Sequence, residues 1–276
     1  MFQNSSDEVL RSEDISRGAD QAGSASHLYP FEREELQSYG REAQRYDASR
    51  FDCGPGQVYH RRELDFLLTH VVVPPRSRVL DLAAGTARMA IPLARRGQSV
   101  VALDLSHEML AAGRKKAFGE GVQHIQFVRG NGRCLPFPDE AFDLVMAIRF
   151  FHLIPKGYHH LYLTEVERVL KPGGLFVAEF LQSSYGLGLS YLLEFRRVYW
   201  YRQRPVTYLS PRQIHQLFHR LAVLRESGVL YPGAATLARL SQGIASALER
   251  GFDHFPLRSL ALHRLVLSRK PAVTHG

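Results

Sequence analysis

Two aspartates and a glycine stand where a parallel sheet would present them to a ligand. The segment 78 to 97, RVLDLAAGTARMAIPLARRG, has the pattern of a buried strand, a tight glycine turn and a helix. Asp81 lies in this strand, Gly85 in the turn, and Asp104 ends the next apolar run. Small ligands of doubly wound folds bind at the carboxyl ends of the strands. The following helix N-terminus presents amides that favour a carboxylate or phosphate. The turn is therefore the first candidate for a ligand site.

Three types of ligand could bind at this turn: a nucleoside triphosphate, a dinucleotide or S-adenosylmethionine. A P-loop places a lysine after its last glycine, and AAGTAR has none, so a nucleoside triphosphate is not favoured. Asp104 stands about twenty residues beyond the turn, where an acid accepts both ribose hydroxyls of an adenosine. This placement suits a dinucleotide and S-adenosylmethionine equally. The rest of the chain has to separate these two.

Ala83 and Ala87 occupy two positions where such turns usually carry glycine. Glycine is required only where φ is positive or where a methyl group would collide, and alanine costs little where φ is negative. We predict ordinary backbone geometry for both alanines and closest approach to the ligand at Gly85. A positive φ at either alanine would instead cost about 1 to 2 kcal/mol and would weaken ligand binding.

The elements that position these residues alternate between strand and helix after Pro75, which is typical of a parallel sheet covered on both faces. The predicted strands are 78–82, 99–104, 124–129, 142–148, 174–180 and a last one within 260–270. The predicted helices are 31–48, 57–70, 87–96, 107–117, 157–170, 188–201 and 211–220. We divide the chain into a flexible tail (1–26), N-terminal helices that cover the site (27–74), a ligand-binding core (75–180), and a lid that also completes the sheet (181–276).

Four blocks of sequence stand in the order and at the spacing of a known family. They are VLDLAAGTAR (79–88), VVALDLSHEML (100–110), GNGRCLPFPDEAFDLVMAIRFFHLIP (130–155) and EVERVLKPGGLFVAEF (165–180). Together they resemble the class I S-adenosylmethionine-dependent methyltransferases, nearest to the ubiquinone and menaquinone C-methyltransferase group. NAD dehydrogenases lack the third and fourth blocks. The resemblance implies an α/β, Rossmann-like, doubly wound and mostly parallel seven-stranded sheet with helical additions at both ends.

The resemblance also implies roles for individual residues. Asp81 would meet the methionine ammonium group of S-adenosylmethionine, and Asp104 would hold the ribose. Asn131 would accept a hydrogen bond from the adenine amino group, as the aspartate common in the family does. The remaining cofactor contacts implied are Tyr46 over the methionine end, Leu105 and Gly132 at the adenine, and Ala83, Gly85 and Ile148. Met109 would flank the adenine or pack in the core from its helix. No metal site is predicted.

Methyl transfer is an in-line displacement that depends mainly on alignment in a dry site. A general base is needed only for a hydroxyl, an acidic carbon or a protonated amine. In the family pattern His152 lies near the reacting centre, and its imidazole could take such a proton; a packed histidine is the alternative. Arg149 could pair with an acidic acceptor group or contact Glu165. Whether carbon, oxygen or nitrogen is methylated stays open.

Charge is unevenly placed in this chain of 276 residues and formal net charge +8. Residues 181–276 hold thirteen basic and four acidic side chains, a net +9. The aromatic and arginine-rich stretch 185–208 would suit a small lipophilic or aromatic acceptor with an acidic group, or a membrane surface. An ordinary lid helix explains it equally well. No known RNA-binding motif accompanies the basic half, so nucleic acid is less favoured.

The sequence predicts a cytoplasmic enzyme, because it has neither an apolar run long enough for a membrane span nor the pattern of a secretory signal. Two isolated cysteines favour free thiols. Two other functions stay open: a cyclase or scaffold on the same fold, and an RNA methyltransferase. Oligomeric state is not predicted.

Overall fold

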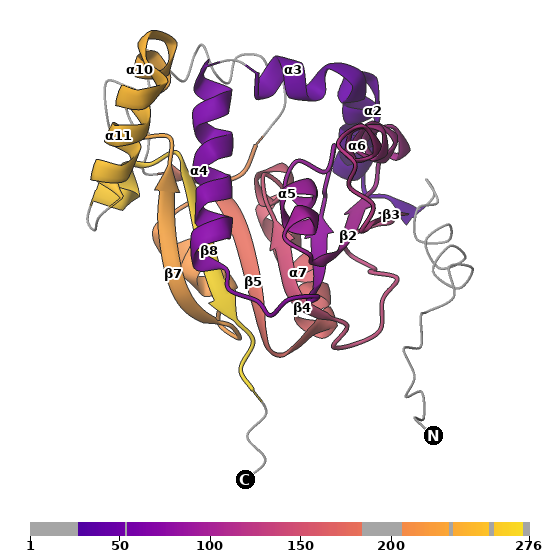
Figure 1. The fold of residues 1–276 in the computed structure, drawn as a ribbon. Helices are drawn as coiled ribbons and strands as arrows, with labels where there is room; N and C mark the ends of the chain where they lie inside the picture. The colour runs from indigo at the N-terminus through magenta and orange to yellow at the C-terminus, as the bar shows by residue number, and fades with distance from the viewer. Residues whose placement is uncertain (1–26, 53, 184–205, 232–233, 254–256, 273–276) are drawn as a thin grey trace, which may run out of the picture.

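The computed structural model describes residues 27–52, 54–183, 206–231, 234–253 and 257–272. The predicted tail (1–26), the predicted helix 188–201 and most of the stretch 185–208 lie outside these residues. The described chain folds around one twisted sheet with helices on both faces (Figure 1). The predicted α/β doubly wound class is confirmed.

The sheet has the strand order β3-β2-β1-β4-β5-β8-β7, with β6 paired to β5 beside this path. Neighbours from β3 to β5 are parallel, and β8 runs antiparallel between β5 and β7. The strands are β1 (Arg78–Leu82), β2 (Ser99–Asp104), β3 (Ile125–Arg129), β4 (Phe142–Ala147), β5 (Leu170–Gln182), β6 (Tyr208–Leu209), β7 (Ala222–Val229) and β8 (His263–Arg269). The central strands are continuous apolar runs because both of their faces are buried.

The helices follow the strands in the alternation that the sequence predicts, with additions at both ends. They are α2 (Pro30–Glu42), α3 (Tyr46–Arg50), α4 (Gly54–His70), α5 (Ala90–Arg95), α6 (His107–Gly119), α7 (His159–Val169), α9 (Pro211–Leu217), α10 (Ala234–Leu240) and α11 (Gln242–Phe252). Short 3-10 turns occupy Ala43–Arg45, Phe151–Leu153, Lys156–Tyr158 and Leu257–Leu260. No helix among the described residues combines the length and apolar character that crossing a bilayer requires.

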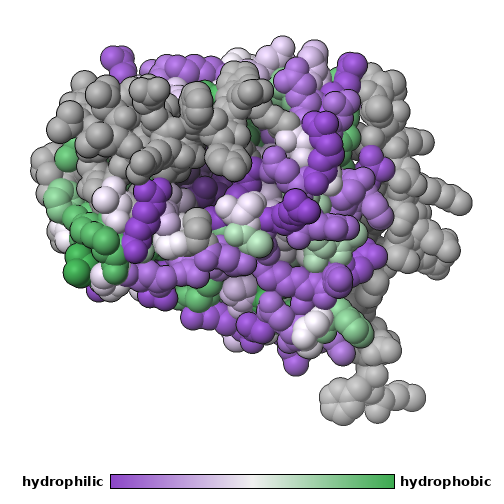
Figure 2. All heavy atoms as spheres, turned by 90° about the horizontal axis from the view of Figure 1, so that it is seen from above, coloured by the Kyte–Doolittle hydropathy of each residue, from purple (hydrophilic) through white to green (hydrophobic). Residues whose placement is uncertain are grey.

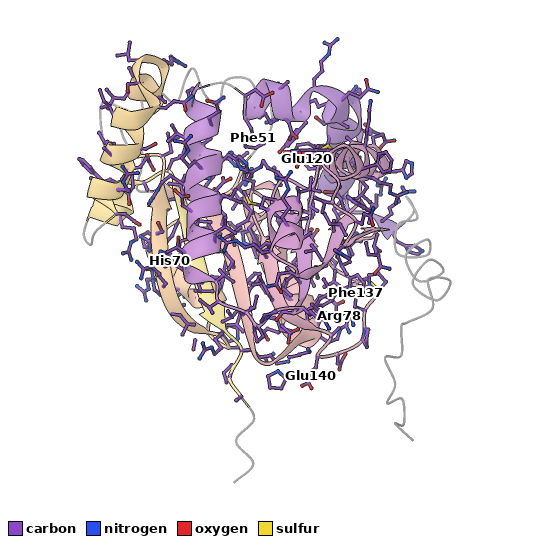
Figure 3. The ribbon with its side chains drawn as sticks, in the orientation of Figure 1. Phe51, His70, Arg78, Glu120, Phe137 and Glu140 are labelled. Atoms are coloured by element: carbon purple, nitrogen blue, oxygen red, sulfur yellow. The ribbon has the colours of Figure 1, made fainter. Side chains whose placement is uncertain are left out.

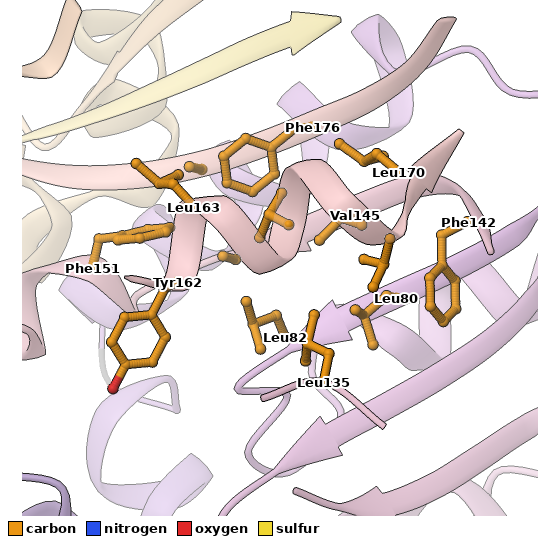
Figure 4. Close-up of a cluster of buried hydrophobic side chains, with 14 of the residues drawn as sticks. Leu80, Leu82, Leu135, Phe142, Val145, Phe151, Tyr162, Leu163, Leu170 and Phe176 are labelled. Carbon is orange, nitrogen blue, oxygen red and sulfur yellow. The ribbon is translucent and has the colours of Figure 1, made fainter. Parts of the chain in front are cut away.

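Two hydrophobic layers hold the helices on the sheet. On one face α7 and α9 pack on aromatic side chains, and the Phe151 and Phe180 rings stack with centroids 5.1 Å apart. Figure 4 shows this layer, with Tyr162 at its edge and the tyrosine hydroxyl pointing away from it. On the other face α4 and α5 bury Leu67 and Ile91. Both faces are therefore closed, and the strand ends are left to form a site.

The strand order reverses between β1 and β4, so the connections leave a crevice at the carboxyl ends of these strands. In Figure 1, α2 and α3 lie across the top of the sheet above this crevice. The N-terminal helices thus lie over the place where a doubly wound fold binds its ligand.

Several element boundaries differ from the sequence prediction. The helix predicted from residue 87 begins at Ala90, because the preceding residues are still in the turn. The N-terminal helix predicted over 31–48 is divided into α2 and α3 by the 3-10 turn Ala43–Arg45. Strand β7 and helices α10 and α11 were not predicted, since their short and mixed sequences lack clear periodicity.

Candidate functional site

A large cavity opens at the carboxyl ends of the parallel strands, beneath α2 and α3. It contains about 1050 Å³ of space between atoms, including its mouth. All ten residues predicted as cofactor contacts line it: Tyr46, Asp81, Ala83, Gly85, Asp104, Leu105, Met109, Asn131, Gly132 and Ile148. They come from five separate segments of the chain, so the fold brings together residues that the sequence spreads over about a hundred positions.

The turn after β1 contradicts the predicted backbone of its alanines. Ala83 has φ 60° and Ala87 has φ 59°, and Gly85 between them has φ 55°. The prediction of ordinary geometry at both alanines is wrong. The turn keeps its path because β2 holds it: the Ala84 amide donates to the Leu103 carbonyl (3.0 Å). The left-handed backbone conformation of each alanine destabilises the folded state by about 1 to 2 kcal/mol.

The surroundings of the turn accommodate these methyl groups. The Ala87 side chain is fully buried, and it faces Gly113 of α6, where a Cβ would lie 3.2 Å from the Ala87 methyl carbon. A glycine on the neighbouring helix thus leaves room for the alanine in the turn. At Gly85, an added Cβ would meet the Met109 methyl carbon at 3.2 Å. Met109 therefore packs directly against the turn.

Asp104 fixes the turn to the end of β2. Its Oδ2 accepts a hydrogen bond from the Gly85 amide, and its Oδ1 accepts one from the Ser106 amide, each at 2.8 Å. Desolvation raises the pKa of Asp104, and these two amides act in the opposite direction. Each carboxylate oxygen retains a second lone pair for a ligand hydroxyl.

Asp81 is the buried acid whose hydrogen bonding is incomplete. Its side chain is only 3% exposed, it lines the cavity, and its Oδ2 has no hydrogen-bond partner among the described residues. Burial raises the pKa of Asp81 to about 8; Arg88 acts to lower it and Asp104 to raise it. A buried carboxylate without a cation is costly. The site therefore suits a ligand that brings a positive group to Asp81.

Glu32 of α2 joins the covering helix to the cavity wall, and the sequence analysis did not identify it. It accepts hydrogen bonds from the Tyr162 hydroxyl (2.6 Å), Asn131 Nδ2 (3.1 Å), Arg133 Nε (2.8 Å) and the Tyr29 amide (2.8 Å). Burial alone would raise the pKa of Glu32, but these hydrogen bonds lower it overall. Asn131 keeps capacity for a ligand, because an amide group offers four hydrogen-bonding positions and Glu32 and the Arg133 amide occupy one each.

A second carboxylate ties α3 to the turn. Asp47 accepts hydrogen bonds from Thr86 Oγ1 at 2.7 Å and from Lys116 Nζ of α6 at 2.8 Å. Its neighbour Tyr46 lines the cavity and packs edge-on against Tyr39 and Phe51. Tyr46 is therefore held at the cavity through its own helix, since Asp47 fixes α3 to the turn.

A buried network of ions forms the wall nearest α4, and it too was missed. Glu63, with no exposed surface, receives Arg88 NH1 on one oxygen (2.5 Å) and Arg149 Nε on the other (2.7 Å). Both arginines line the cavity, and the Arg88 guanidinium stacks on the Phe51 ring at 4.0 Å. Figure 3 shows Phe51 below α3 and beside α4. Burial, together with the charge of Arg88, lowers the pKa of His60 to about 4, so His60 is neutral beside this pair.

Arg149 follows β4 in a left-handed conformation, φ 57°. Its amide donates to Glu179 Oε2 at 2.9 Å, and Glu179 Oε1 lies 2.6 Å from His263 Nδ1. Burial would raise the pKa of Glu179, but His263 and Arg149 hold it well below its usual range. The suggested contact between Arg149 and Glu165 is wrong, because Glu165 binds the Leu135 amide and Arg168 instead.

His152 lies between residues that line the cavity but is not itself among the lining residues. It is buried in the 3-10 turn Phe151–Leu153, and its carbonyl accepts a hydrogen bond from the Thr207 amide at 2.8 Å. Its neighbours Phe150, Leu153 and Ile154 line the cavity, whereas the described residues that line it do not include His152. The structure thus brings the ten predicted cofactor contacts together but does not add the predicted base to them.

Comparison with known proteins gives these residues a context. A family model described as a methyltransferase domain matches residues 79–174. The chain is 31% identical over 200 residues to a demethylmenaquinone methyltransferase of Geobacillus kaustophilus, covering 70% of this chain and 82% of that protein. It is 32% identical over 181 residues to the enzyme of the same name from Bacillus cytotoxicus, covering 64% and 72%.

Solved structures share the fold. A geranyl diphosphate C-methyltransferase from Streptomyces coelicolor, crystallised with S-adenosyl-L-homocysteine, aligns with TM-score 0.62 and 14% identity over 88% of this chain and 99% of its own. The [4+2]-cyclase SpnF aligns with TM-score 0.55 and 18% identity, covering 76% and 80%. At these identities the likeness concerns architecture alone.

Proposed function

Because this chain belongs to the class I S-adenosylmethionine-dependent methyltransferases, we propose that it transfers a methyl group to a small lipophilic acceptor of the quinol type. S-adenosylmethionine is its cofactor, and when bound it supplies an electrophilic methyl group on a sulfonium. The observation that carries the proposal is the convergence of five separate segments on one cavity. The printed names of the curated relatives support the acceptor class.

The hydrogen bonding of two acidic residues in the cavity supports S-adenosylmethionine as the ligand. Asp81 is a buried carboxylate with an oxygen that lacks a hydrogen-bond donor, and the methionine ammonium is a donor of the matching charge. Asp104 is held by two backbone amides with lone pairs to spare for ribose hydroxyls. We assign Asn131 and Gly132 to the adenine ring, between Leu105 and Met109.

Arg88 extends this assignment to the other end of the methionine moiety. Its hydrogen bonds to the described residues Glu63 and His60 both use NH1. We infer that the NH2 and Nε donors of the guanidinium serve the ligand. Arg88 also acts electrostatically on Asp81, so the two opposite charges lie near each other on the same cavity wall. We infer that Asp81 and Arg88 bind the ammonium and the carboxylate of the amino-acid end.

The acceptor side of the proposal follows from the lining beyond the turn. Phe150, Leu153 and Ile154 supply apolar walls, and Arg149 supplies a cation beside them. Such walls exclude water and fit a flat apolar molecule with an acidic or hydroxyl group. We keep the base predicted from the sequence, His152, as the group that removes the acceptor proton, because its chain neighbours Phe150 and Leu153 line the cavity. The proposal keeps a cytoplasmic site of action, which the free thiol of Cys134 favours.

Calorimetry with S-adenosylhomocysteine and an assay of its release test the two halves separately. We expect binding of the cofactor product, and methyl transfer to naphthoquinol acceptors above phenolic or acyl-lipid acceptors. His152→Ala should lower turnover and spare cofactor affinity. Turnover confined to non-quinol acceptors would overturn the acceptor class, and unchanged turnover in His152→Ala would remove the base.

A further inference from the structure

Helices α10 and α11 form a hairpin whose inner side is already occupied. Ala238 and Ala245 pack against Val58 of α4. Glu249 is fully buried and accepts hydrogen bonds from the Leu230 and Tyr231 amides at 3.0 and 2.8 Å. The inward face is therefore fixed on the body of the protein, and the outward face is left to solvent.

The outward face carries large apolar side chains. Leu240 is 81% exposed and Ile244 is 58% exposed. Leu240 is the last residue of α10, and Ile244, Ala247 and Gly251 are exposed at helical spacing on one face of α11. Figure 2 shows an apolar patch on the side of the molecule where α10 and α11 lie. A single exposed leucine needs no explanation, but a contiguous apolar patch indicates a contact surface.

The exposed charges that α10 and α11 themselves carry are positive. Arg239 directly precedes Leu240 at the end of α10, and Arg250 directly precedes Gly251 on α11. Both side chains are exposed, and neither makes an ion pair with a described residue. Across the described part of 206–272 no acidic side chain is exposed, because Glu226, Glu249 and Asp253 are partly or fully buried. Six arginines are exposed there: Arg212, Arg220, Arg225, Arg239, Arg250 and Arg269.

We propose that the outer face of α10 and α11 docks on an anionic lipid surface. A lipid surface can bind both the apolar and the basic side chains of this face. The acyl region would accommodate Leu240 and Ile244. The anionic headgroups would pair with Arg239 and Arg250. A second copy of the chain would place arginines against arginines. A nucleic acid would pair with the arginines but leave the leucine and isoleucine in water.

Docking through this face would bring the cavity close to a lipophilic acceptor. This advantage rests on the proposed function. In Figure 1, α10 lies at the same end of the sheet as α2 and α3, which cover the cavity. Docking through α10 and α11 therefore keeps that end of the molecule near the lipid surface, where a lipophilic acceptor is held.

Sedimentation of the full chain with vesicles tests the proposal. We expect binding to vesicles of phosphatidylglycerol and phosphatidylcholine in equal parts, weakened by salt and by omission of phosphatidylglycerol. The double variant Leu240→Ser/Ile244→Ser should lower the partition coefficient by about tenfold or more. The double variant Arg239→Ala/Arg250→Ala should lower it by about fivefold for each arginine.

Two further variants serve as matched controls. Phe118 of α6 is 87% exposed and Val72 after α4 is 81% exposed, both away from the hairpin. Phe118→Ser and Val72→Ser should sediment as the unchanged protein does. All variants should keep the calorimetric binding of S-adenosylhomocysteine, which separates this proposal from the proposed function.

Four results would overturn the proposal. The first is a serine double variant that binds as the unchanged protein does, the second is an equal loss of affinity in Phe118→Ser, and the third is equal binding to neutral vesicles. A dimer in solution that Ile244→Ser dissociates would assign the face to a second copy instead.

Discussion

At the scale of single residues, the alanines of the turn depart most from sequence reasoning. Ala83 has φ 60°, a conformation that glycine adopts freely. We expect Ala83→Gly to raise the free energy of unfolding by roughly 0.5 to 1 kcal/mol, because relief of strain exceeds the added entropy of the unfolded chain. Urea unfolding monitored by fluorescence measures the change.

Ala84 provides the matched control for this prediction. It lies between the two left-handed positions 83 and 85, is buried, and is absent from the residues of positive φ. Ala84→Gly should therefore destabilise by about 1 kcal/mol. An Ala83→Gly variant that loses as much stability as Ala84→Gly would show that the alanine is not strained.

The raised pKa of Asp81 predicts that cofactor binding depends on pH. Its pKa of about 8 in the folded protein lies above the ordinary value of 3.8, so the folded state holds a proton there that the unfolded state has lost. Stability without cofactor should accordingly fall as pH rises from about 4 to about 8. Pairing with an ammonium requires the ionised form, so affinity for S-adenosylhomocysteine should rise up to about tenfold per pH unit below 8.

Calorimetry in buffers of different ionisation enthalpy measures this proton release directly. Asp81→Asn has no proton to release, so its binding should be weaker and independent of pH between 6 and 8, a range set by the pKa shift. A buffer-independent binding heat in the unchanged protein at pH 7 would show that Asp81 is already ionised before the cofactor binds.

Sequence reasoning found the polar residues that belong to motifs and missed those that do not. Asp81, Asp104 and Asn131 stand at strand ends, where the order of elements alone predicts their convergence. Glu32 and Glu63 lie on the N-terminal helices and meet partners about 25 to 130 residues away, at distances that only the docked helices determine. Local periodicity contains no information about such contacts.

At the scale of elements, α2 depends on Glu32 for its place over the cavity. Glu32 is 5% exposed and accepts hydrogen bonds from Tyr162, Asn131 and Arg133. Glu32→Gln should cost about 2 to 3 kcal/mol, because an amide leaves the Arg133 cation without its counter-ion. Hydrogen exchange should show faster exchange in α2 before the sheet is affected.

The control for this variant lies on the same helix. Glu34 is exposed two residues further along α2, and Glu34→Gln should leave exchange in α2 unchanged. Equal exchange in Glu32→Gln and Glu34→Gln would mean that apolar contacts alone hold the helix.

Glu63 has the corresponding role for α4. Its buried carboxylate is shared by Arg88 and Arg149, which follow different strands. Glu63→Gln should destabilise the protein by about 3 to 5 kcal/mol, since it leaves buried arginines without a counter-ion. The exposed Asp65 of the same helix supplies the control Asp65→Asn, expected to be neutral in urea unfolding. A loss below 1 kcal/mol in Glu63→Gln would show that water or the acid Glu179 compensates the arginines.

The strands were predicted more accurately than the helices, for a physical reason. Strands β1 and β2 match the predicted ranges 78–82 and 99–104 because both of their faces are buried, which leaves an uninterrupted apolar run. Strand β7 was missed because it carries Arg225, Glu226 and Ser227 within an edge position. An edge strand does not need the apolar run that identifies a central one.

At the scale of the whole molecule, two carboxylates join the covering helices to the loops at the carboxyl ends of the strands. Glu32 binds Asn131, and Asp47 binds Thr86 of the turn. A ligand that contacts both the turn and Asn131 orders the residues to which the cover is attached. Cofactor binding should therefore slow hydrogen exchange in α2 and α3 together with the turn, and less so in α10 and α11, which lie on α4 and β7.

The coupling between cofactor binding and folding also sets the expected increase in the stability of the folded protein. At a free ligand concentration a hundred times its dissociation constant, binding stabilises the folded state by about 2.7 kcal/mol. For a chain of this length the melting temperature should rise by about 5 to 10 °C. The double variant Glu32→Gln/Asp47→Asn should still be stabilised by S-adenosylhomocysteine, but without added protection in α2 and α3. Protection of α2 and α3 that persists in this variant would mean that the ligand itself, and not the two carboxylates, holds the cover closed.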